Sequence, residues 1–554
     1  MTRKEIKKEI KKIIETAIIT AYHKTHGREF YGMVVVEKPK EKLHGDYSTN
    51  VALVLAKSLK KNPVEVAQKI KDIIDKKYFK KVEVVGGFIN FFLKDEIFGE
   101  NVKQILKEKD NFGKNNSLKS KKVIIEYTDP NPFKKFHIGH LMPNTIGESL
   151  ARVFEFQGAS IKRVNYQGDV GVHVAKAVWA IKQGIDLQEA YAYGHKAYEE
   201  NEIQKQEILD INKKIYERSD KEINKLYDQG RKQSLAYFET VYEKLGTKFD
   251  HYFFESEVAD IGKKIVLEGL KKGIFEKGEK DAVIFKGEHT RVFISSEGLA
   301  TYEAKDLALP GLKYKYFKYD MSVIVTANEQ NAYFNVMLDA LSKMSPDLAK
   351  KTGHIGHGLL RLPSGKMSSR TGTIVPVEDF IKQVEKHIKE KIGERNLADE
   401  DMEKIAIGAI RYSILKQSIG SDIIYDANKS VSFEGDSGPY LQYSYARAIS
   451  ILKRAATERI KPSFKNVPRE VSQLEKDMYY FPEIVEKSGK ELEPHVVSLY
   501  LTELAREFNN YYANSKIVDK EDELSPYKVA LTKAFSIIMK NGLWLLGINT
   551  LERM

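Results

Sequence analysis

Glu126-Tyr-Thr-Asp-Pro-Asn-Pro-Phe-Lys-Lys-Phe-His-Ile-Gly-His140 is the stretch that decides the expected fold of this 554-residue chain. A β-branched run over 123–127 leads into it, and a helical pattern begins near His140, with Pro143 in its first turn. His137 and His140 are therefore expected just beyond the carboxyl end of a strand, at a helix start. Parallel α/β sheets bind ligands at this place, and a helix N-terminus favours phosphate.

Gly139 between the two histidines leaves room for a nucleotide to approach the backbone. Two other interpretations of the histidines stay open, a metal pair or ordinary helix-start residues. A metal pair needs further ligands, and none is adjacent in the sequence. Taken alone, His-x-Gly-His is a weak signal.

Outward from this stretch, β-branched runs alternate with helical patterns, which is typical of a Rossmann-type parallel sheet. The alternating runs lie at 123–127 and 161–166, with a helix over 170–181, and strand-like runs return at 282–285, 292–295 and 321–325. From about 186 to 280 the chain is charged and helical in pattern, which indicates an insertion in this domain.

The flanking regions differ in texture from the middle of the chain. Residues 1–93 mix helical patterns with β-rich runs at 32–37 and 82–93, and after about 395 the pattern is helical to the end. We therefore expect a multidomain α/β protein with an α+β domain over 1–115, the Rossmann-type domain over 116–395 and an all-α bundle over 396–554.

Composition narrows the class of protein. The apolar fraction of 42% excludes a disordered or collagen-like chain, and the absence of Cys excludes disulfides, Cys-ligated zinc, iron–sulfur clusters and thiol nucleophiles. No membrane span is expected, and the charged helical pattern over 1–26 is not a signal peptide, so we expect a cytoplasmic protein. The net charge of +12 fits a nucleic-acid partner, although a Lys-rich soluble enzyme would also carry it.

A second polar segment, Pro363-Ser-Gly-Lys-Met-Ser-Ser-Arg-Thr-Gly372, carries Lys366 and Arg370 between two glycines. A loop of this kind can move and place a cation against a polyphosphate leaving group. By itself it could equally be a solvated surface turn.

Together the two segments resemble the HIGH and KMSKS signatures of class I aminoacyl-tRNA synthetases. They stand here as His137-Ile138-Gly139-His140 and Lys366-Met367-Ser368-Ser369-Arg370. A second His-Ile-Gly-His occurs at 354–357, but it leads into a strand-like run rather than a helix, so we assign it a structural role.

The resemblance narrows to arginyl-tRNA synthetases and covers nearly the whole chain. It is carried by Glu126, Pro130, Asn131 and Lys134, by the run 165–171, by Tyr302-Glu-Ala-Lys-Asp306 and by Asn328-Glu-Gln330. It implies a set of arginine-binding residues: Glu126, Asp129, Asn131, His140, Tyr302, Asp306 and Gln330. A guanidinium needs a planar set of acceptors, which Asp306, Glu126 and Tyr302 can supply. Gln330, Asn131 and His140 can hold the α-ammonium and carboxylate.

The chain departs from the family pattern at two places. Asp129-Pro130-Asn131 stands where the family commonly has Ser-Pro-Asn, and the added carboxylate could bind the substrate ammonium or repel its carboxylate. Leu141-Met142 replaces the usual His-Leu-Arg continuation, which removes a cation from the helix start.

The resemblance implies an ATP-dependent ligase that forms arginyl-adenylate and pyrophosphate and then transfers arginine to the 3′ end of its cognate tRNA. Enzymes of this kind generally need tRNA present to activate arginine. His137 and His140 would face the phosphates, and Lys366 would close over the pyrophosphate. Mg²⁺ is expected with the nucleotide, without zinc or another protein-bound metal, and we expect a monomer.

tRNA contacts are implied in both flanking regions. Phe88 would stack on an unpaired base with Asn90 at its edge, and Tyr440, Gln442, Tyr443 and Arg447 would meet the anticodon stem. The alternative is that Phe88 and the tyrosine stripe are core residues.

Two rival functions stay open from the sequence. One is another class I synthetase or a smaller HIGH-type nucleotidyltransferase, which the set Tyr302, Asp306 and Gln330 argues against. The other is a non-catalytic RNA-binding paralogue, which would have no need of His137, His140 and Lys366.

Overall fold

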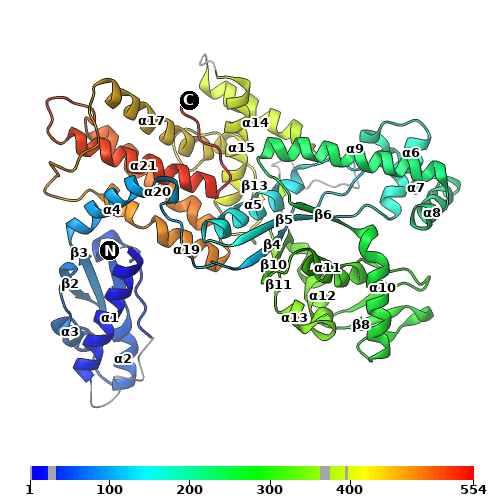
Figure 1. The fold of residues 1–554 in the computed structure, drawn as a ribbon, viewed down its shortest axis with the longest axis horizontal. Coiled ribbons are helices and arrows are strands. Elements are labelled where there is room, and N and C mark those ends of the chain that lie inside the picture. Colours follow the sequence, from blue (N-terminus) through cyan, green and yellow to red (C-terminus); the bar gives the residue numbers. More distant parts are fainter. Residues whose placement is uncertain (1–2, 23–32, 362–374, 394–396) are drawn as a thin grey trace. The chain divides into compact units, whose positions relative to one another are not determined.

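The computed structural model describes residues 3–22, 33–361, 375–393 and 397–554 (Figure 1). The chain forms two compact units. The first comprises Met1–Gly113, Arg447–Glu483 and Glu503–Asn541, and the second comprises Lys114–Ala446, Ile484–Thr502 and Gly542–Met554. The domain boundaries expected after residues 115 and 395 stay predictions.

A five-stranded parallel sheet forms the centre of the second unit, which confirms the predicted Rossmann-type sheet. Its strand order is β11-β10-β4-β5-β6. The strands are β4 (Lys122–Glu126), β5 (Ser160–Gln167), β6 (His251–Phe254), β10 (Met321–Ala327) and β11 (Thr352–His357). The chain builds outward from β4 to β6 and then returns to the other side of β4, so the order reverses between β4 and β10.

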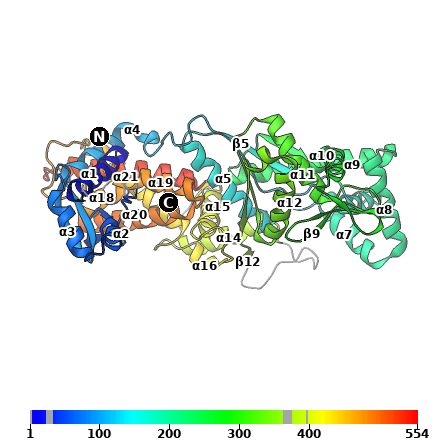
Figure 2. The ribbon, with the colours of Figure 1, turned by 90° about the horizontal axis from the view of Figure 1, so that it is seen from below.

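Helices cover both faces of this sheet because side chains alternate along each strand. Ile124 and Val164 pack with Val258 and Leu309 on one face, whereas the Tyr127 hydroxyl on the other donates to Glu148 at 2.6 Å. The helices concerned are α5 (Leu141–Phe156) on the Tyr127 side, and α10 (Glu255–Lys271) and α11 (Tyr302–Tyr316) on the Ile124 side (Figure 2). α12 (Asn331–Met344) and α13 (Pro346–Ala349) follow β10.

The helical insertion is present, but it is shorter than expected. It consists of α7 (Leu187–Glu200), α8 (Glu202–Glu217) and α9 (Lys221–Leu245), which follow α6 (Val172–Lys182). Residues 251–254, expected inside the insertion, form β6 of the central sheet. This strand is only four residues long and lies between two charged helices, so its signal is weak. β7 (Glu276–Lys277), β8 (Val283–Lys286) and β9 (Thr290–Ile294) form a separate antiparallel sheet.

The insertion holds the loop that precedes His137. Phe133 is buried in a cluster with Trp179, Ile215 and Tyr227, and its backbone N–H donates to the Ser234 hydroxyl at 2.9 Å. A Cβ added at Gly230 of α9 would lie 2.3 Å from the Phe133 ring, so only glycine permits this approach.

The C-terminal part of the chain is helical, as predicted. Its helices are α14 (Val377–Ile392), α15 (Asp399–Leu415), α16 (Ala427–Ser430), α17 (Gly438–Thr457), α18 (Gln473–Tyr479), α19 (Phe481–Glu491), α20 (His495–Asn514) and α21 (Ser525–Leu545). β12 (Leu360–Arg361) and β13 (Ile423–Ile424) form a short parallel pair. No helix in the described ranges has both the length and the apolar content that a membrane crossing requires.

The N-terminal part of the first unit is an α+β structure around an antiparallel sheet of order β1-β3-β2. Its elements are α1 (Arg3–Tyr22), β1 (Tyr47–Thr49), α2 (Val51–Leu59), α3 (Pro63–Ile73), β2 (Phe79–Val85), β3 (Phe88–Leu93) and α4 (Asp95–Glu108). The prediction of a β-run over 32–37 is wrong. Val34 and Val36 are buried, but the only strand-like pairing in the described part, 33–37, is a single bridge from Glu37 to Ser48.

A buried carboxylate fastens α5 to two strands. Glu148 receives Arg152 Nε at 2.6 Å, Arg163 Nε at 3.0 Å and the Tyr127 hydroxyl at 2.6 Å. Two guanidinium groups lower the pKa of Glu148 despite its burial, so it stays charged. Beside it, a Cβ at Gly147 would lie 2.2 Å from Tyr127 Cγ.

We expect Gly147→Ala to lower the melting temperature by several degrees, since overpacking a core contact destabilises by about 1–3 kcal/mol. Gly311→Ala is the matched control in the same unit. Gly311 is also helical, but an added Cβ there meets no atom within 4 Å, and alanine favours a helix interior by up to about 1 kcal/mol. Scanning calorimetry of both variants tests this packing, and an unchanged melting temperature for Gly147→Ala would contradict it.

Candidate active site

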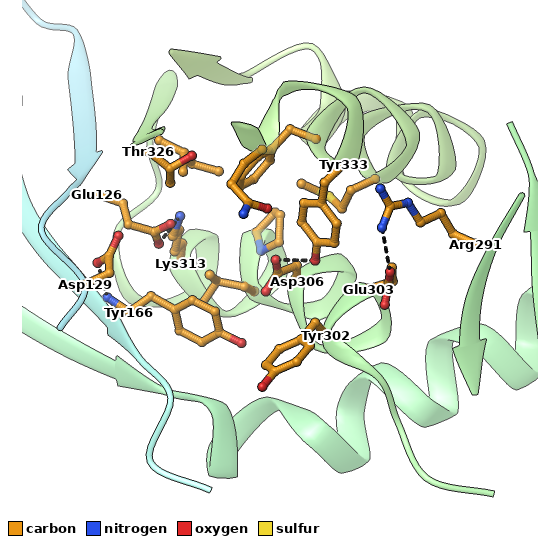
Figure 3. Close-up of a pocket in the computed structure, with 16 residues that line it drawn as sticks. Glu126, Asp129, Tyr166, Arg291, Tyr302, Glu303, Asp306, Lys313, Thr326 and Tyr333 are labelled. Atoms are coloured by element: carbon orange, nitrogen blue, oxygen red, sulfur yellow. Dashed lines mark hydrogen bonds and ion pairs between the residues drawn. The ribbon is translucent and has the colours of Figure 1, made fainter. Parts of the chain in front are cut away.

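A cavity of about 460 Å³ lies at the carboxyl ends of β4 and β10, where the strand order reverses (Figure 3). Glu126 of β4 and Thr326 of β10 line it, and α11 and α12 supply most of the remaining wall. Open α/β sheets bind their ligands at such reversal points. The volume suits a small molecule of amino-acid size.

Five of the residues predicted to bind arginine line this one cavity: Glu126, Asp129, Tyr302, Asp306 and Gln330. The other two, Asn131 and His140, do not line it. The Asn131 amide oxygen accepts from the backbone N–H of Gly168 at 3.0 Å, and His140 lies at the start of α5. The sequence therefore predicted five of the sixteen residues that line the cavity. Among the polar and charged lining residues that it missed are Tyr166, Arg291, Lys313 and Tyr333.

Asp306 is the acceptor that the cavity offers most directly. Its Oδ2 accepts the Tyr333 hydroxyl at 2.5 Å. Desolvation raises the pKa of Asp306 to about 7, with Glu255 and Glu126 adding to the rise, while Tyr333 and Lys313 oppose it. The carboxylate can thus change its charge near neutral pH.

Glu126 is already paired. Its Oε2 lies 2.6 Å from the Lys313 Nζ, and the two residues are 3% and 0% exposed. Lys313 follows Asp306 by seven residues, which is two turns along the same face of α11. This spacing was the one sequence signal that could have revealed Lys313. Pro310 between them has no N–H, so the helical hydrogen bond to the Asp306 carbonyl is absent.

Asp129 belongs to a strained loop. Thr128 and Asp129 have φ angles of 82° and 44°, which β-branched and other L-residues rarely adopt. Asp129 Oδ1 accepts from the Tyr166 backbone N–H at 2.7 Å. Desolvation and the neighbouring Glu126 raise the pKa of Asp129 well above its usual range. At this departure from the family pattern, the side-chain carboxylate of Asp129 therefore accepts a hydrogen bond from the backbone, and its negative charge is weakened.

The outer wall of the cavity carries a second ion pair, in which Arg291 of β9 lies 3.5 Å from Glu303. Tyr302 stands beside Glu303 with 57% of its surface exposed. The Tyr302 ring is therefore accessible to a ligand entering the cavity.

The first His-Ile-Gly-His forms a compact helix start. The backbone N–H of Gly139 donates to His137 Nδ1 at 3.1 Å, and that of His137 donates to His140 Nδ1 at 3.1 Å. The two rings stack with centroids 3.9 Å apart. Because both Nδ1 atoms accept, both rings carry their proton on Nε2, provided they are neutral.

Their surroundings keep both histidines neutral. Desolvation and the Lys134 ammonium lower the pKa of His137 to about 4. Desolvation, His137 and Lys134 lower the pKa of His140 well below its usual range. At neutral pH the helix start thus offers two neutral N–H donors with a lysine beside them, rather than two cationic rings.

The second signature lies outside the described residues, since Lys366, Met367, Ser368, Ser369 and Arg370 all fall within 362–374. The second His-Ile-Gly-His forms part of β11, in agreement with the structural role assigned to it. His354 stacks on Phe334 at 4.0 Å between ring centroids, and its Nε2 lies 2.7 Å from the Thr326 hydroxyl.

The predicted tRNA contacts differ in accessibility. Phe88 is 43% exposed, whereas Asn90 is 2% exposed within β3. In α17, Tyr440 and Gln442 are buried, and the Gln442 amide donates to the carbonyl of Asn549 at 2.8 Å. Asn90, Tyr440 and Gln442 therefore lie in the core here. Their side chains are too buried to contact RNA.

Tyr443 and Arg447 are half-buried on the same helix. The Tyr443 ring lies edge-on to Phe433, and Arg447 donates to the Asn509 amide oxygen at 2.5 Å. Both keep part of their surface accessible.

Three parts of the chain match known protein families. Residues 4–93 match the arginyl tRNA synthetase N terminal domain, residues 101–427 the tRNA synthetases class I (R) catalytic domain, and residues 441–554 the DALR anticodon binding domain.

Whole-length relatives agree with these matches. The arginine–tRNA ligases of Clostridium acetobutylicum and Clostridium perfringens are each 33% identical to this chain, over 94% of it and 96% of their own length.

Solved structures share the fold. The arginyl-tRNA synthetase of Thermus thermophilus matches with a TM-score of 0.75 at 24% identity, over 98% of this chain and 100% of its own. That of Plasmodium falciparum matches with a TM-score of 0.79 at 23% identity, over 99% of both chains. Together with the sequence matches, the cavity at the β4–β10 reversal and the histidine pair, these likenesses show that the chain belongs to the arginyl-tRNA synthetase family.

Proposed function

We propose that this chain is an arginine–tRNA ligase whose cavity at the β4–β10 reversal binds L-arginine. The observation that carries the proposal is the meeting of Asp306, Glu126 and Tyr302 in one cavity of amino-acid size. A carboxylate and a tyrosine face are the groups that bind a guanidinium. Gln330, which also lines the cavity, is the proposed contact of the α-ammonium or carboxylate.

In the proposed reaction the arginine carboxylate attacks the α-phosphorus of ATP, which gives arginyl-adenylate and releases pyrophosphate. The terminal ribose hydroxyl of tRNA then takes the arginyl group and AMP leaves. The protein's task is to position these groups and to stabilise developing phosphate charge. Nε2–H of His137 and of His140 would donate to phosphate oxygens, and Lys366 of the second signature would offset the charge of the leaving pyrophosphate, with Met367, Ser368, Ser369 and Arg370 completing its loop.

Mg²⁺ would accompany the nucleotide. The groups described at the helix start are ring N–H donors and the Lys134 ammonium, and these do not ligate Mg²⁺, which prefers oxygen. We therefore propose that phosphate oxygens of ATP hold the ion.

tRNA binding is proposed for both flanking regions, over 1–115 and 396–554. Phe88 is the proposed stacking residue because its ring is exposed, and Tyr443 and Arg447 are the proposed contacts in α17. A monomer in the cytoplasm is the proposed working state.

An amino-acid panel in pyrophosphate exchange, run with and without tRNA, tests the function. We expect exchange to depend on arginine, because the guanidinium has two polar edges that the ammonium of lysine lacks. We also expect exchange to need tRNA, as it generally does in enzymes of this family. Exchange driven by another amino acid would favour a different class I enzyme, and no exchange with any amino acid would favour a non-catalytic RNA-binding protein.

We expect Asp306→Asn to raise the KM for arginine about 100-fold, since it removes the charge from a desolvated ion pair worth about 3 kcal/mol. The KM for ATP should change little. Glu303→Gln removes a charge from the same cavity, but Glu303 is already paired with Arg291, so its effect should stay below about fivefold. Steady-state exchange kinetics distinguish these outcomes, and equal KM changes for arginine in the two variants would contradict the assignment.

The pKa of Asp306 predicts that kcat/KM for arginine declines on the acid side of its pH profile, and we call this decline the acid limb. Above about pH 7 the free carboxylate is ionised and attracts the guanidinium, and below it protonation removes that attraction. We expect kcat/KM for arginine to fall up to about tenfold per pH unit below this value, because kcat/KM reports the free enzyme. The limb should be absent from Asp306→Asn, and its persistence there would assign it to another group.

A further inference from the structure

The charges that line the cavity are not all available to a ligand. Four carboxylates and two cations line it, and the cations are already engaged, Arg291 with Glu303 and Lys313 with Glu126. Asp129 is held by the Tyr166 backbone, and its raised pKa weakens its charge. Asp306, whose Oδ2 accepts the neutral Tyr333 hydroxyl, is the carboxylate whose charge we assign to the substrate cation (Figure 3).

We propose that Lys313 is a positioning residue of the arginine cavity. Its ammonium fixes Glu126 and sets the cavity's negative charge, so that Asp306 is ionised when it meets the guanidinium. This inference rests on the proposed function, because it assumes that arginine binds here. Lys313 itself does not contact the substrate in this proposal.

Geometry supports this role. The 2.6 Å pair joins the carboxyl end of β4 to the last turn of α11, and both partners are almost completely buried. A buried carboxylate without this partner would be strongly disfavoured in its charged form. Two desolvated carboxylates in one cavity also resist ionising together. A fixed internal cation relieves that repulsion before the substrate arrives.

The charged and titratable groups that act on Asp306 come from every element around it. They are Tyr333 of α12, Glu255 of α10, Glu126 of β4, Asp129 of the following loop, Tyr166 of β5, and Lys313 and Tyr302 of α11 itself. The paired Arg291 of β9 and Glu303 of α11 line the same cavity. Lys313 supplies the positive charge in this group that opposes the protonation of Asp306, together with the Tyr333 hydrogen bond.

The test measures kcat/KM for arginine against pH, by tRNA-dependent pyrophosphate exchange, in four full-length proteins. The acid limb of the unaltered protein is expected near pH 7. It should move up by about one unit or more in Lys313→Met, where Glu126 and Asp306 share one proton and Asp306 is fully ionised only after both have ionised. It should move down in Glu126→Gln, where Lys313 is left to act on Asp306. It should return toward pH 7 in the double variant, which restores the net charge.

A structural role alone predicts a different pattern. If the pair only joined α11 to β4, these substitutions would lower the melting temperature while the acid limb stayed in place, and that result would overturn the proposal. Should Lys313→Met not fold, the downward shift in Glu126→Gln decides the question, and an unmoved limb there also overturns it. Lys313→Arg keeps the cation and should retain the limb near pH 7. An unaltered protein that shows no arginine-dependent exchange would instead refute the proposed function.

Discussion

The reversal of strand order between β4 and β10 is the constraint on which the site depends. A parallel strand must end at the same edge as its neighbours, so every connection returns across a face of the sheet. Because the chain leaves β4 on one side and comes back on the other, the connections diverge and leave a space at this edge. Glu126 and Thr326 border it from the two adjacent strands.

Because side chains alternate along a strand, successive residues at the end of β4 point to opposite faces of the sheet. Glu126 turns toward α11 and pairs with Lys313, whereas Tyr127 turns toward α5 and donates to Glu148. The strained turn at Thr128 and Asp129 follows at once. Strain of this kind persists only where the surroundings enforce it. Here the Tyr166 backbone and the burial of Phe133 in the insertion cluster do so, which gives the insertion a role in holding the loop before His137.

Patterns in the sequence predicted the fold class, but they did not reveal which charged side chains pair with one another. Most strands of the central sheet, the helix start at His140 and five of the cavity's lining residues could be predicted, because they depend on local periodicity and family motifs. β6 escaped prediction because four residues carry little signal. The run over 32–37 looked like a strand, but pairing depends on a partner that the sequence does not reveal. Lys313 was missed for the same reason, since seven residues from Asp306 means proximity only once α11 is known to be helical. Asn90 and Gln442 looked like RNA contacts, and only tertiary packing shows them to be buried.

A net charge of +12 does not conflict with an acidic cavity, because positive and negative groups are separated within the site. At the start of α5, neutral ring donors, Lys134 and the helix N-terminus favour anions. At the floor of the cavity, Asp306 favours a cation, and the internal ammonium of Lys313 limits how far the negative charge accumulates. If Lys313 were absent, the carboxylates would reduce their repulsion by taking up a proton, and the site would lose the charge that a guanidinium requires. In the proposed arginine cavity, a buried cation is therefore consistent with binding of a cationic substrate, because it stabilises the ionised state of the carboxylate beside it.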